Sequence, residues 1–260
     1  MRQGVLAIRS IRLIICEPCR LVYRPLPKCA STTMYGLLAR LGGDAGRPGD
    51  NPRRVLPLVR GPTEPGRGGT YEVIWPSEDT EALLQRYGDY TTFSVVRDPF
   101  DRVASNYHNK LNRFARRFQM ATYYGGYFGP LLEGVSPLEP LRRIRWMQRS
   151  IPFDRFVDVL DSRGIEWDIH FDLQVRLLGT GAIHYDHLIP MESLATGLKT
   201  LLDDRDLARS GVRLLDDLGR LNASFVRTAS SLWSETTRAT VAKLYAVDFE
   251  QLGYAARLAA

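Results

Sequence analysis

The sequence predicts an α/β fold in which a central parallel β-sheet is flanked by helices. Two short runs, 21–26 and 91–96, have the length and the β-branched, aromatic and aliphatic composition of buried strands. A segment with helical periodicity follows each of them, and strands that alternate with helices are typical of parallel sheets. The chain has 260 residues, 44% of them hydrophobic, which is enough to bury a large core without disulfides or structural metals.

The first strand leads into the clearest helix of the chain. After a tight loop at 27–31, a helix is predicted from about Thr32 until Gly42 and Gly43 end it. Its apolar positions recur at i, i+3, i+4 and i+7, at Met34, Leu37, Leu38 and Leu41. The next segment, 42–69, is rich in Gly, Pro and Arg and is predicted to be a long surface loop.

The second strand is followed by a helix that opens at Asp98 and Pro99, as N-cap and first helical residue. Its buried stripe is predicted to consist of Phe100, Val103, Ala104, Tyr107 and Leu111. Elsewhere we expect a short strand at 184–189, a loop at 123–140, and helices at 77–87, 151–161, 194–202, 204–218 and 234–250, the last of them capped by Ser234.

Charge and cysteine content narrow the classes of partner. The net charge of +6, carried almost entirely by arginine, fits polyanionic partners such as nucleotides, acidic glycans or nucleic acid, or equally a solvated arginine-rich surface. The odd, small number of cysteines argues against a secreted disulfide scaffold. Cys16 and Cys19 form a C-x-x-C pair, but no second pair exists to complete a zinc site. We therefore expect packing cysteines and no metal.

The N-terminal segment contains no predicted membrane span. Residues 5–16 are apolar but are interrupted by Arg9 and Arg12, and no run approaches the roughly 18–20 apolar residues that cross a bilayer. A cleavage site of small residues after a clean apolar core is also missing. We expect a soluble, cytoplasmic chain.

The loop between the first strand and its helix has the composition of an anion site. A helix N-terminus offers backbone N–H groups and the positive end of the helix dipole. Ser31, Thr32 and Thr33 add hydroxyl groups in the first turn, and Lys28 adds a charge in the loop. The loop lacks the glycines of a Walker A motif, so the enclosed anion should be smaller than a triphosphate. A plain Ser/Thr-rich helix start beside a lysine is the alternative.

A second anion-binding pattern surrounds the second strand. Arg97 stands at the carboxyl end of that strand, the edge where α/β sheets place ligands. Ser105 lies eight residues further, off the predicted apolar stripe, so core packing does not explain it. An arginine fork with a serine hydroxyl suits a phosphate monoester. The alternative is an Arg97–Asp101 pair and a surface serine.

The two patterns together resemble the carbohydrate sulfotransferase family, which includes the Golgi chondroitin and dermatan enzymes and bacterial relatives. The residues that carry the resemblance are P-K-x-A-S-T from Pro27 and V-R-D-P-F-x-R-x-x-S-x-Y-x-N-K from Val96. Further similar segments occur at 168–174, 185–192, 221–224 and 244–254. The resemblance thus spans about 21–254, and we predict one P-loop-like, three-layer sulfotransferase domain over 1–260.

The resemblance implies a donor, 3′-phosphoadenosine 5′-phosphosulfate (PAPS), and a division of labour between the two motifs. Its 5′-phosphosulfate would bind at Lys28, Cys29, Ala30, Ser31, Thr32 and Thr33. Its 3′-phosphate would bind at Arg97 and Ser105. The acceptor would be a glycan or another molecule with a hydroxyl group, and we expect no nucleic-acid partner.

The implied chemistry is in-line attack of the acceptor hydroxyl on sulfur, which requires no metal. Lys28 is the candidate for stabilising charge on the leaving oxygen. A histidine suits the general base near neutral pH, and His170 is the leading candidate because its segment matches the family. Glu64 and Glu72 compete for that role, since related enzymes use carboxylates after the first loop.

Two other functions compete with sulfuryl transfer. A P-loop kinase using ATP and magnesium requires the glycine-rich loop that is missing here. A non-catalytic module that binds polyanions would leave the ordered pair of anion motifs without a role. The sequence does not identify the acceptor, whose recognition we assign to the variable loops 43–70 and 123–140.

Overall fold

The computed structural model describes residues 10–43, 56–60, 68–76, 85–108, 152–180, 183–204, 207 and 232–255. The chain divides into two compact units. The first comprises Met1–Asp98 and Gln174–Val226, and the second comprises Pro99–Leu173 and Arg227–Ala260. Each unit is therefore built from two separate stretches of sequence.

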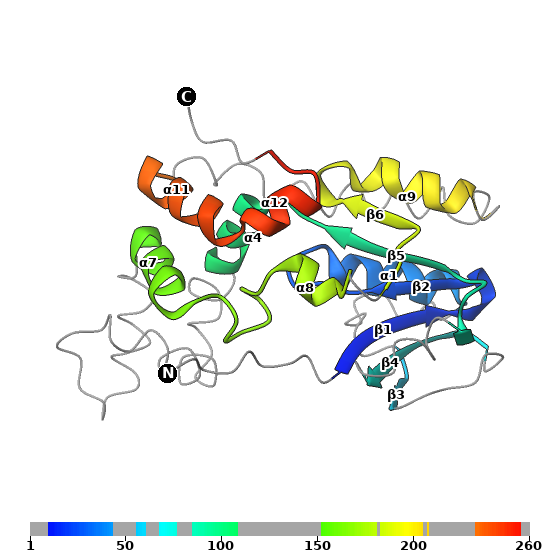
Figure 1. The fold of residues 1–260 in the computed structure, drawn as a ribbon. Helices are drawn as coiled ribbons and strands as arrows, with labels where there is room; N and C mark the ends of the chain where they lie inside the picture. Colours follow the sequence, from blue (N-terminus) through cyan, green and yellow to red (C-terminus); the bar gives the residue numbers. More distant parts are fainter. Residues whose placement is uncertain are drawn as a thin grey trace. The chain divides into compact units, whose positions relative to one another are not determined.

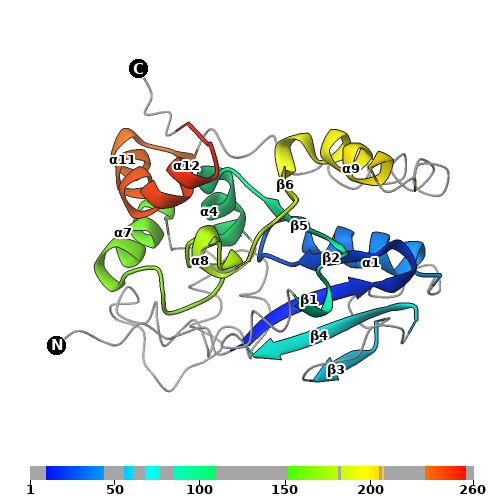
Figure 2. The same cartoon turned by 45° about the vertical axis from the view of Figure 1, so that its right-hand side comes forward.

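A six-stranded mixed sheet forms the framework of the first unit (Figure 1). Its strands follow the order β3 (Leu58–Arg60), β4 (Thr70–Pro76), β1 (Ser10–Cys16), β2 (Leu21–Arg24), β5 (Thr91–Val96) and β6 (His187–Pro190). Strands β2, β5 and β6 are parallel, whereas β1 is antiparallel to both β2 and β4. The predicted α/β class with parallel core strands flanked by helices is confirmed, although the whole sheet is mixed. Figure 2 shows the strands fanning with the usual twist of a sheet.

Three strands were missed by the sequence prediction, and all lie on one side of the sheet. Strands β1 and β4 each carry a charged residue within an apolar run, Arg12 and Glu72, which hides the strand pattern. In the structure these residues form an ion pair, with 3.1 Å between Arg12 Nε and Glu72 Oε1. The predicted loop 42–69 is partly wrong because it contains β3.

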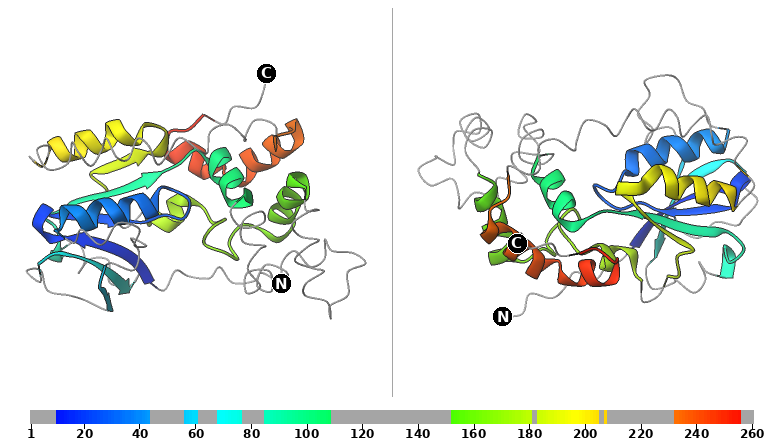
Figure 3. Two further views of the ribbon diagram at one scale, coloured as in Figure 1. Left: turned by 180° about the vertical axis from the view of Figure 1, so that it is seen from behind. Right: turned by 90° about the horizontal axis from the view of Figure 1, so that it is seen from above.

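Helices α1 (Ser31–Leu41) and α9 (Leu194–Asp203) lie along the same face of this sheet (Figure 3, right). Helix α9 approaches β6 so closely that a Cβ on Gly197 would collide with Ile189. The predicted helices from Thr32 and at 194–202 are confirmed to within a residue. A short helix, α8 (Gln174–Leu178), and two 3₁₀ helices, η1 (Glu17–Cys19) and η5 (Met191–Ser193), also belong to this unit.

Cys16 and Cys19 are free, buried thiols that support the end of α1. Cys16 Sγ lies 3.8 Å from the Leu38 carbonyl oxygen, and Cys19 Sγ lies 3.7 Å from that of Leu41. Both thiols thus donate to carbonyls of the last turn of α1, where the Leu38 carbonyl also accepts the Gly42 N–H at 2.9 Å. The expected packing role of this pair is confirmed.

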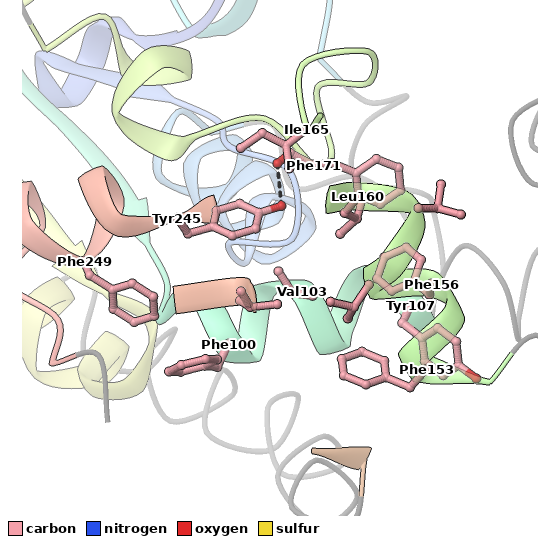
Figure 4. Packing of buried hydrophobic residues seen from close by; sticks show 13 residues of the cluster. Phe100, Val103, Tyr107, Phe153, Phe156, Leu160, Ile165, Phe171, Tyr245 and Phe249 are labelled. Carbon is pink, nitrogen blue, oxygen red and sulfur yellow. Dashed lines mark hydrogen bonds between the residues drawn. The ribbon is translucent and has the colours of Figure 1, made fainter. Parts of the chain in front are cut away.

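The second unit is helical and has an aromatic core (Figure 4). Its helices are α4 (Pro99–Tyr107), α7 (Phe153–Arg163), α11 (Glu235–Leu244) and α12 (Ala246–Gln251). Phe153 meets Tyr107 and Trp233 edge to face, with ring centroids 5.2 and 4.7 Å apart. Among the described residues, no helix combines the length and apolar character needed to span a bilayer.

Most helix predictions for the second unit are confirmed. Ser234 caps α11 with a capping box in which it exchanges hydrogen bonds with Thr237. The predicted last helix is broken at Tyr245 into α11 and α12. The loop at 123–140 and nearly all of the helices at 77–87 and 204–218 lie outside the described residues.

Candidate active site

A short loop at 27–30 carries the first anion motif from β2 into α1. Lys28 and Ala30 adopt the left-handed conformation, with φ of 67° and 52°. For residues other than glycine this conformation costs about 1 kcal/mol each, so the fold must hold the loop in shape. Ala30 is the N-cap of α1, and its methyl group cannot accept hydrogen bonds from the first-turn amides. The positive end of the helix is therefore formed without a side-chain cap.

The side chains of this loop differ in exposure. Thr32 is exposed, Lys28 and Thr33 are half-buried, and Ser31 is buried with 7% of its surface exposed. Cys29 is fully buried, and its Sγ lies 3.3 Å from Gln174 Oε1. Cys29 can therefore serve an anion only through its backbone, while the lysine and the hydroxyl groups lie nearer the surface.

Arg97 meets this loop within the same unit. It follows β5, and its Nη1 donates to the Lys28 carbonyl oxygen at 3.3 Å. The side-chain amide of Gln174 pairs with the Arg97 backbone: Arg97 N–H donates to Oε1 at 2.9 Å, and Nε2 donates to the Arg97 carbonyl at 2.8 Å. Arg97 and the main chain of Lys28, 69 residues apart in sequence, thus meet at the carboxyl ends of β2 and β5, as the parallel pairing predicts.

Glu72 lies in a buried polar network beside this loop helix. Its carboxylate accepts hydrogen bonds from Tyr35 Oη, in the second turn of α1, and from Arg12 Nε at 3.1 Å. Burial, together with the hydrogen bond to Glu72, raises the pKa of Tyr35 to about 12. Tyr35 therefore remains a proton donor at neutral pH, and Glu72 has structural partners already. Glu64, the other carboxylate candidate, lies outside the described residues.

His170 belongs to the second unit and is paired with a buried carboxylate. Its Nδ1 lies 2.6 Å from Asp168 Oδ1, which also accepts the His170 backbone N–H at 2.8 Å. The Asp168 side chain is 6% exposed and that of His170 is 27% exposed. This contact favours the proton on Nδ1, and the neutral imidazole then carries its lone pair on Nε2. The pair has the chemistry of an oriented general base.

The turn that carries His170 is held by buried side chains. Its four successive carbonyls at 169–172 all accept hydrogen bonds from outside the turn. Arg102, with 1% of its surface exposed, donates to Asp172 at 2.7 Å and to Ile169 at 3.4 Å. Asn106 donates to His170 at 2.5 Å, and Tyr245 Oη donates to Phe171 at 2.6 Å, the dashed line in Figure 4. The imidazole therefore stands on a fixed backbone.

Comparisons with known proteins agree with the two anion motifs. A model of the sulfotransferase family matches residues 12–255. The chain belongs to the sulfotransferase family. Carbohydrate sulfotransferase 8 of Homo sapiens is 24% identical over 195 residues, which cover 74% of this chain and 42% of that protein. The Mus musculus protein of the same name is 23% identical over 195 residues, with 74% and 43% covered.

The chain spans less than half the length of these curated relatives. No solved structure matches it significantly. The two anion motifs lie inside the segment that the family model matches.

The second half of the predicted 3′-phosphate site, Ser105, belongs to the second unit, whereas Arg97 belongs to the first. The expectation that Ser105 escapes the packed side of its helix is wrong. Helix α4 buries every residue from Arg102 to Tyr107, and Ser105 is 5% exposed. Because nearly every residue of this short helix is buried, a position off its apolar stripe is not an exposed position.

Several residues of this sulfotransferase site were missed from the sequence. Gln174 and Asp168 lie in the segment 168–174, which was noted only for its resemblance. Arg102 and Asn106 lie within the second motif but serve the turn that carries His170. Both are polar residues in a helix that is otherwise buried, and this burial is seen only in the folded structure.

Two further histidines, His184 and His187, each lie near a carboxylate. His187 Nε2 lies 3.3 Å from Asp204, and His184 Nε2 lies 3.9 Å from Asp186. Within the described part of the chain, no group of His, Cys, Asp and Glu residues is arranged to hold a metal ion.

Proposed function

We propose that this chain transfers a sulfuryl group from PAPS to a hydroxyl group of a carbohydrate. The observation that carries the donor half is the loop at 27–30, where an uncapped helix start, Lys28 and Arg97 meet in one unit. Phosphate and sulfate groups bind well to such helix ends. Cytoplasmic location and a single domain over 1–260 stay predictions.

In the proposed donor site, each group has a separate role. The amides and hydroxyls at 31–33 hold the 5′-phosphosulfate, and Arg97 holds the 3′-phosphate. A role for Ser105 in binding the 3′-phosphate stays a prediction from the motif. The contact with the Lys28 carbonyl uses one of the five N–H groups of Arg97, so the fork keeps further donors for phosphate. Lys28 neutralises the charge that grows on the oxygen between phosphorus and sulfur, which stabilises the transition state more than the bound donor.

We propose His170 as the general base. In this step the acceptor hydroxyl forms a bond to sulfur while the bond from sulfur to the bridging oxygen breaks. The hydroxyl proton passes to His170 Nε2, and 3′-phosphoadenosine 5′-phosphate leaves. Asp168 keeps the proton on Nδ1 before the step and stabilises the imidazolium afterwards.

The proposal of a carbohydrate acceptor rests on the two relatives, both named carbohydrate sulfotransferase 8. A screen of glycans with labelled donor tests it directly. Label on a glycan hydroxyl supports the proposal, and label only on non-carbohydrate hydroxyls contradicts this half of it.

A thermal-shift assay tests the donor. We expect 3′-phosphoadenosine 5′-phosphate to raise the melting temperature and Mg-ATP to leave it nearly unchanged, because the loop has no glycine with which to wrap a triphosphate. Stabilisation by Mg-ATP alone would favour the kinase alternative. Polyanion binding without donor turnover in any variant would favour the non-catalytic module.

A further inference from the structure

Gln174 is a fully buried polar residue that the proposed mechanism does not use. It opens α8, and none of its side chain is exposed. Its amide hydrogen-bonds to both backbone groups of Arg97, and its Oε1 accepts from the Cys29 thiol. A buried side chain with this many partners can be replaced only by one of the same shape and hydrogen-bonding groups, because each buried partner left without a hydrogen bond lowers the stability of the fold.

The bonds of Gln174 close a ring around the donor loop. Gln174 contacts Cys29 in the loop and Arg97 at the end of β5. Arg97 then returns to the loop through its bond to the Lys28 carbonyl. Every member of this ring lies in the first unit. The ring therefore fixes the spacing between the left-handed loop and the backbone of Arg97.

A glutamine meets these demands and its nearest substitutes do not. The bonds require an acceptor for the Arg97 N–H and Cys29 thiol and a donor for the Arg97 carbonyl. Glutamate supplies no N–H donor, and asparagine is one methylene shorter. Because one amide pairs with both backbone groups of Arg97, it fixes the position of the Arg97 main chain.

We infer that Gln174 is a positioning residue that sets the distance between the 5′-phosphosulfate loop and the arginine for the 3′-phosphate. This inference rests on the proposed function, because it assigns the two segments to the two ends of one donor. It predicts that Gln174 matters most for ligands that engage both segments at once. A ligand with only the 5′-phosphate needs the loop but not the spacing.

The test compares two nucleotides by calorimetry, 3′-phosphoadenosine 5′-phosphate and adenosine 5′-phosphate, well below the melting temperature. In Gln174→Met, which removes all three bonds at similar volume, we expect affinity for the bisphosphate to fall about tenfold or more, since misplaced binding groups lose much of their effect. Affinity for the monophosphate should fall less than about threefold, because one binding segment is enough for it. Ser94→Ala is the matched control: Ser94 is buried in β5 and donates to the Arg24 carbonyl at 2.6 Å.

Two substitutions of Cys29 test the same inference with a smaller change to the buried bonds. Cys29→Ser keeps a donor for Gln174 and should preserve the preference for the bisphosphate, whereas Cys29→Ala should reduce it. Equal losses for both nucleotides in Gln174→Met, or an unchanged preference in both Gln174→Met and Cys29→Ala, would overturn the inference. A wild-type protein that does not prefer the bisphosphate would instead contradict the proposed function.

Discussion

The donor loop at 27–30 and the turn at 168–172 use the main chain in opposite ways. The loop ends at a helix start that no side chain caps, and its backbone N–H groups are the proposed ligands of the anion. In the turn, all four carbonyls at 169–172 accept hydrogen bonds from buried side chains. In the turn the backbone is held in place by these bonds, and the group proposed to react is a side chain, that of His170. An anion site can be built from backbone groups, whereas a general base has to be a side chain, and an imidazole suits that role near neutral pH.

This difference predicts different mutational behaviour. Side-chain changes in the loop should affect activity with little loss of stability, apart from buried Cys29. Changes around the turn should lower stability as well, because they leave buried carbonyls without donors.

Lys28→Ala should lower kcat by about 10²–10³-fold, the usual cost of one group that stabilises transition-state charge. The melting temperature should change little because Lys28 is half-buried. Lys199→Ala removes the same charge from an exposed position on α9 and is the control. Turnover by Lys28→Ala close to that of the control would contradict the role of this lysine.

His170→Ala should lower kcat about 10²-fold, within the range of a lost general base. Wild-type activity should fall on the acid side as the imidazole takes up a proton, and this dependence should vanish in the variant. Glu72→Gln should lower the melting temperature through its lost ion pair with Arg12 but change kcat much less. If Glu72→Gln loses the rate and His170→Ala keeps it, the carboxylate is the base.

Asp168→Asn should lower kcat about tenfold, because the amide no longer favours a proton on Nδ1. Nitrogen NMR of the ring should report the Nδ1–H tautomer in the wild type and its loss in the variant. Asp172→Asn is the control, since Asp172 bonds the Leu173 N–H in the same turn. An unchanged ring spectrum in Asp168→Asn would refute the orienting role.

Tyr245→Phe should lower the free energy of unfolding by about 1 kcal/mol, the usual net worth of one buried hydrogen bond. Burial raises the pKa of the Tyr245 phenol, so the folded state holds this proton more tightly than the unfolded state. Its contribution is complete below the ordinary phenol pKa of about 10 and is lost as the pH rises above it. Melting curves from pH 8 to 11 should show a shallower decline in the variant, and identical declines would count against the assignment.

The sequence predicted the elements whose pattern is local. Helix α1 has an unbroken apolar stripe, and β5 is a continuous β-branched and aromatic run, so both were placed to within a residue. Strands β1 and β4 were not predicted, because the charges of Arg12 and Glu72 form an ion pair only after the two strands have paired. Lys28 and Arg97 could be identified because their motifs are short and contiguous. Gln174 could not, because its partners are 77 and 145 residues away in sequence.

Lys28 is proposed to act in sulfuryl transfer from PAPS. The most direct test of this role follows labelled sulfuryl from PAPS onto a mixture of glycans with the wild type, Lys28→Ala and Lys199→Ala. We predict labelled glycan and an equal amount of 3′-phosphoadenosine 5′-phosphate with the wild type and Lys199→Ala, and loss of both with Lys28→Ala. Equal transfer by all three proteins, or no release of the bisphosphate by the wild type, would contradict the account.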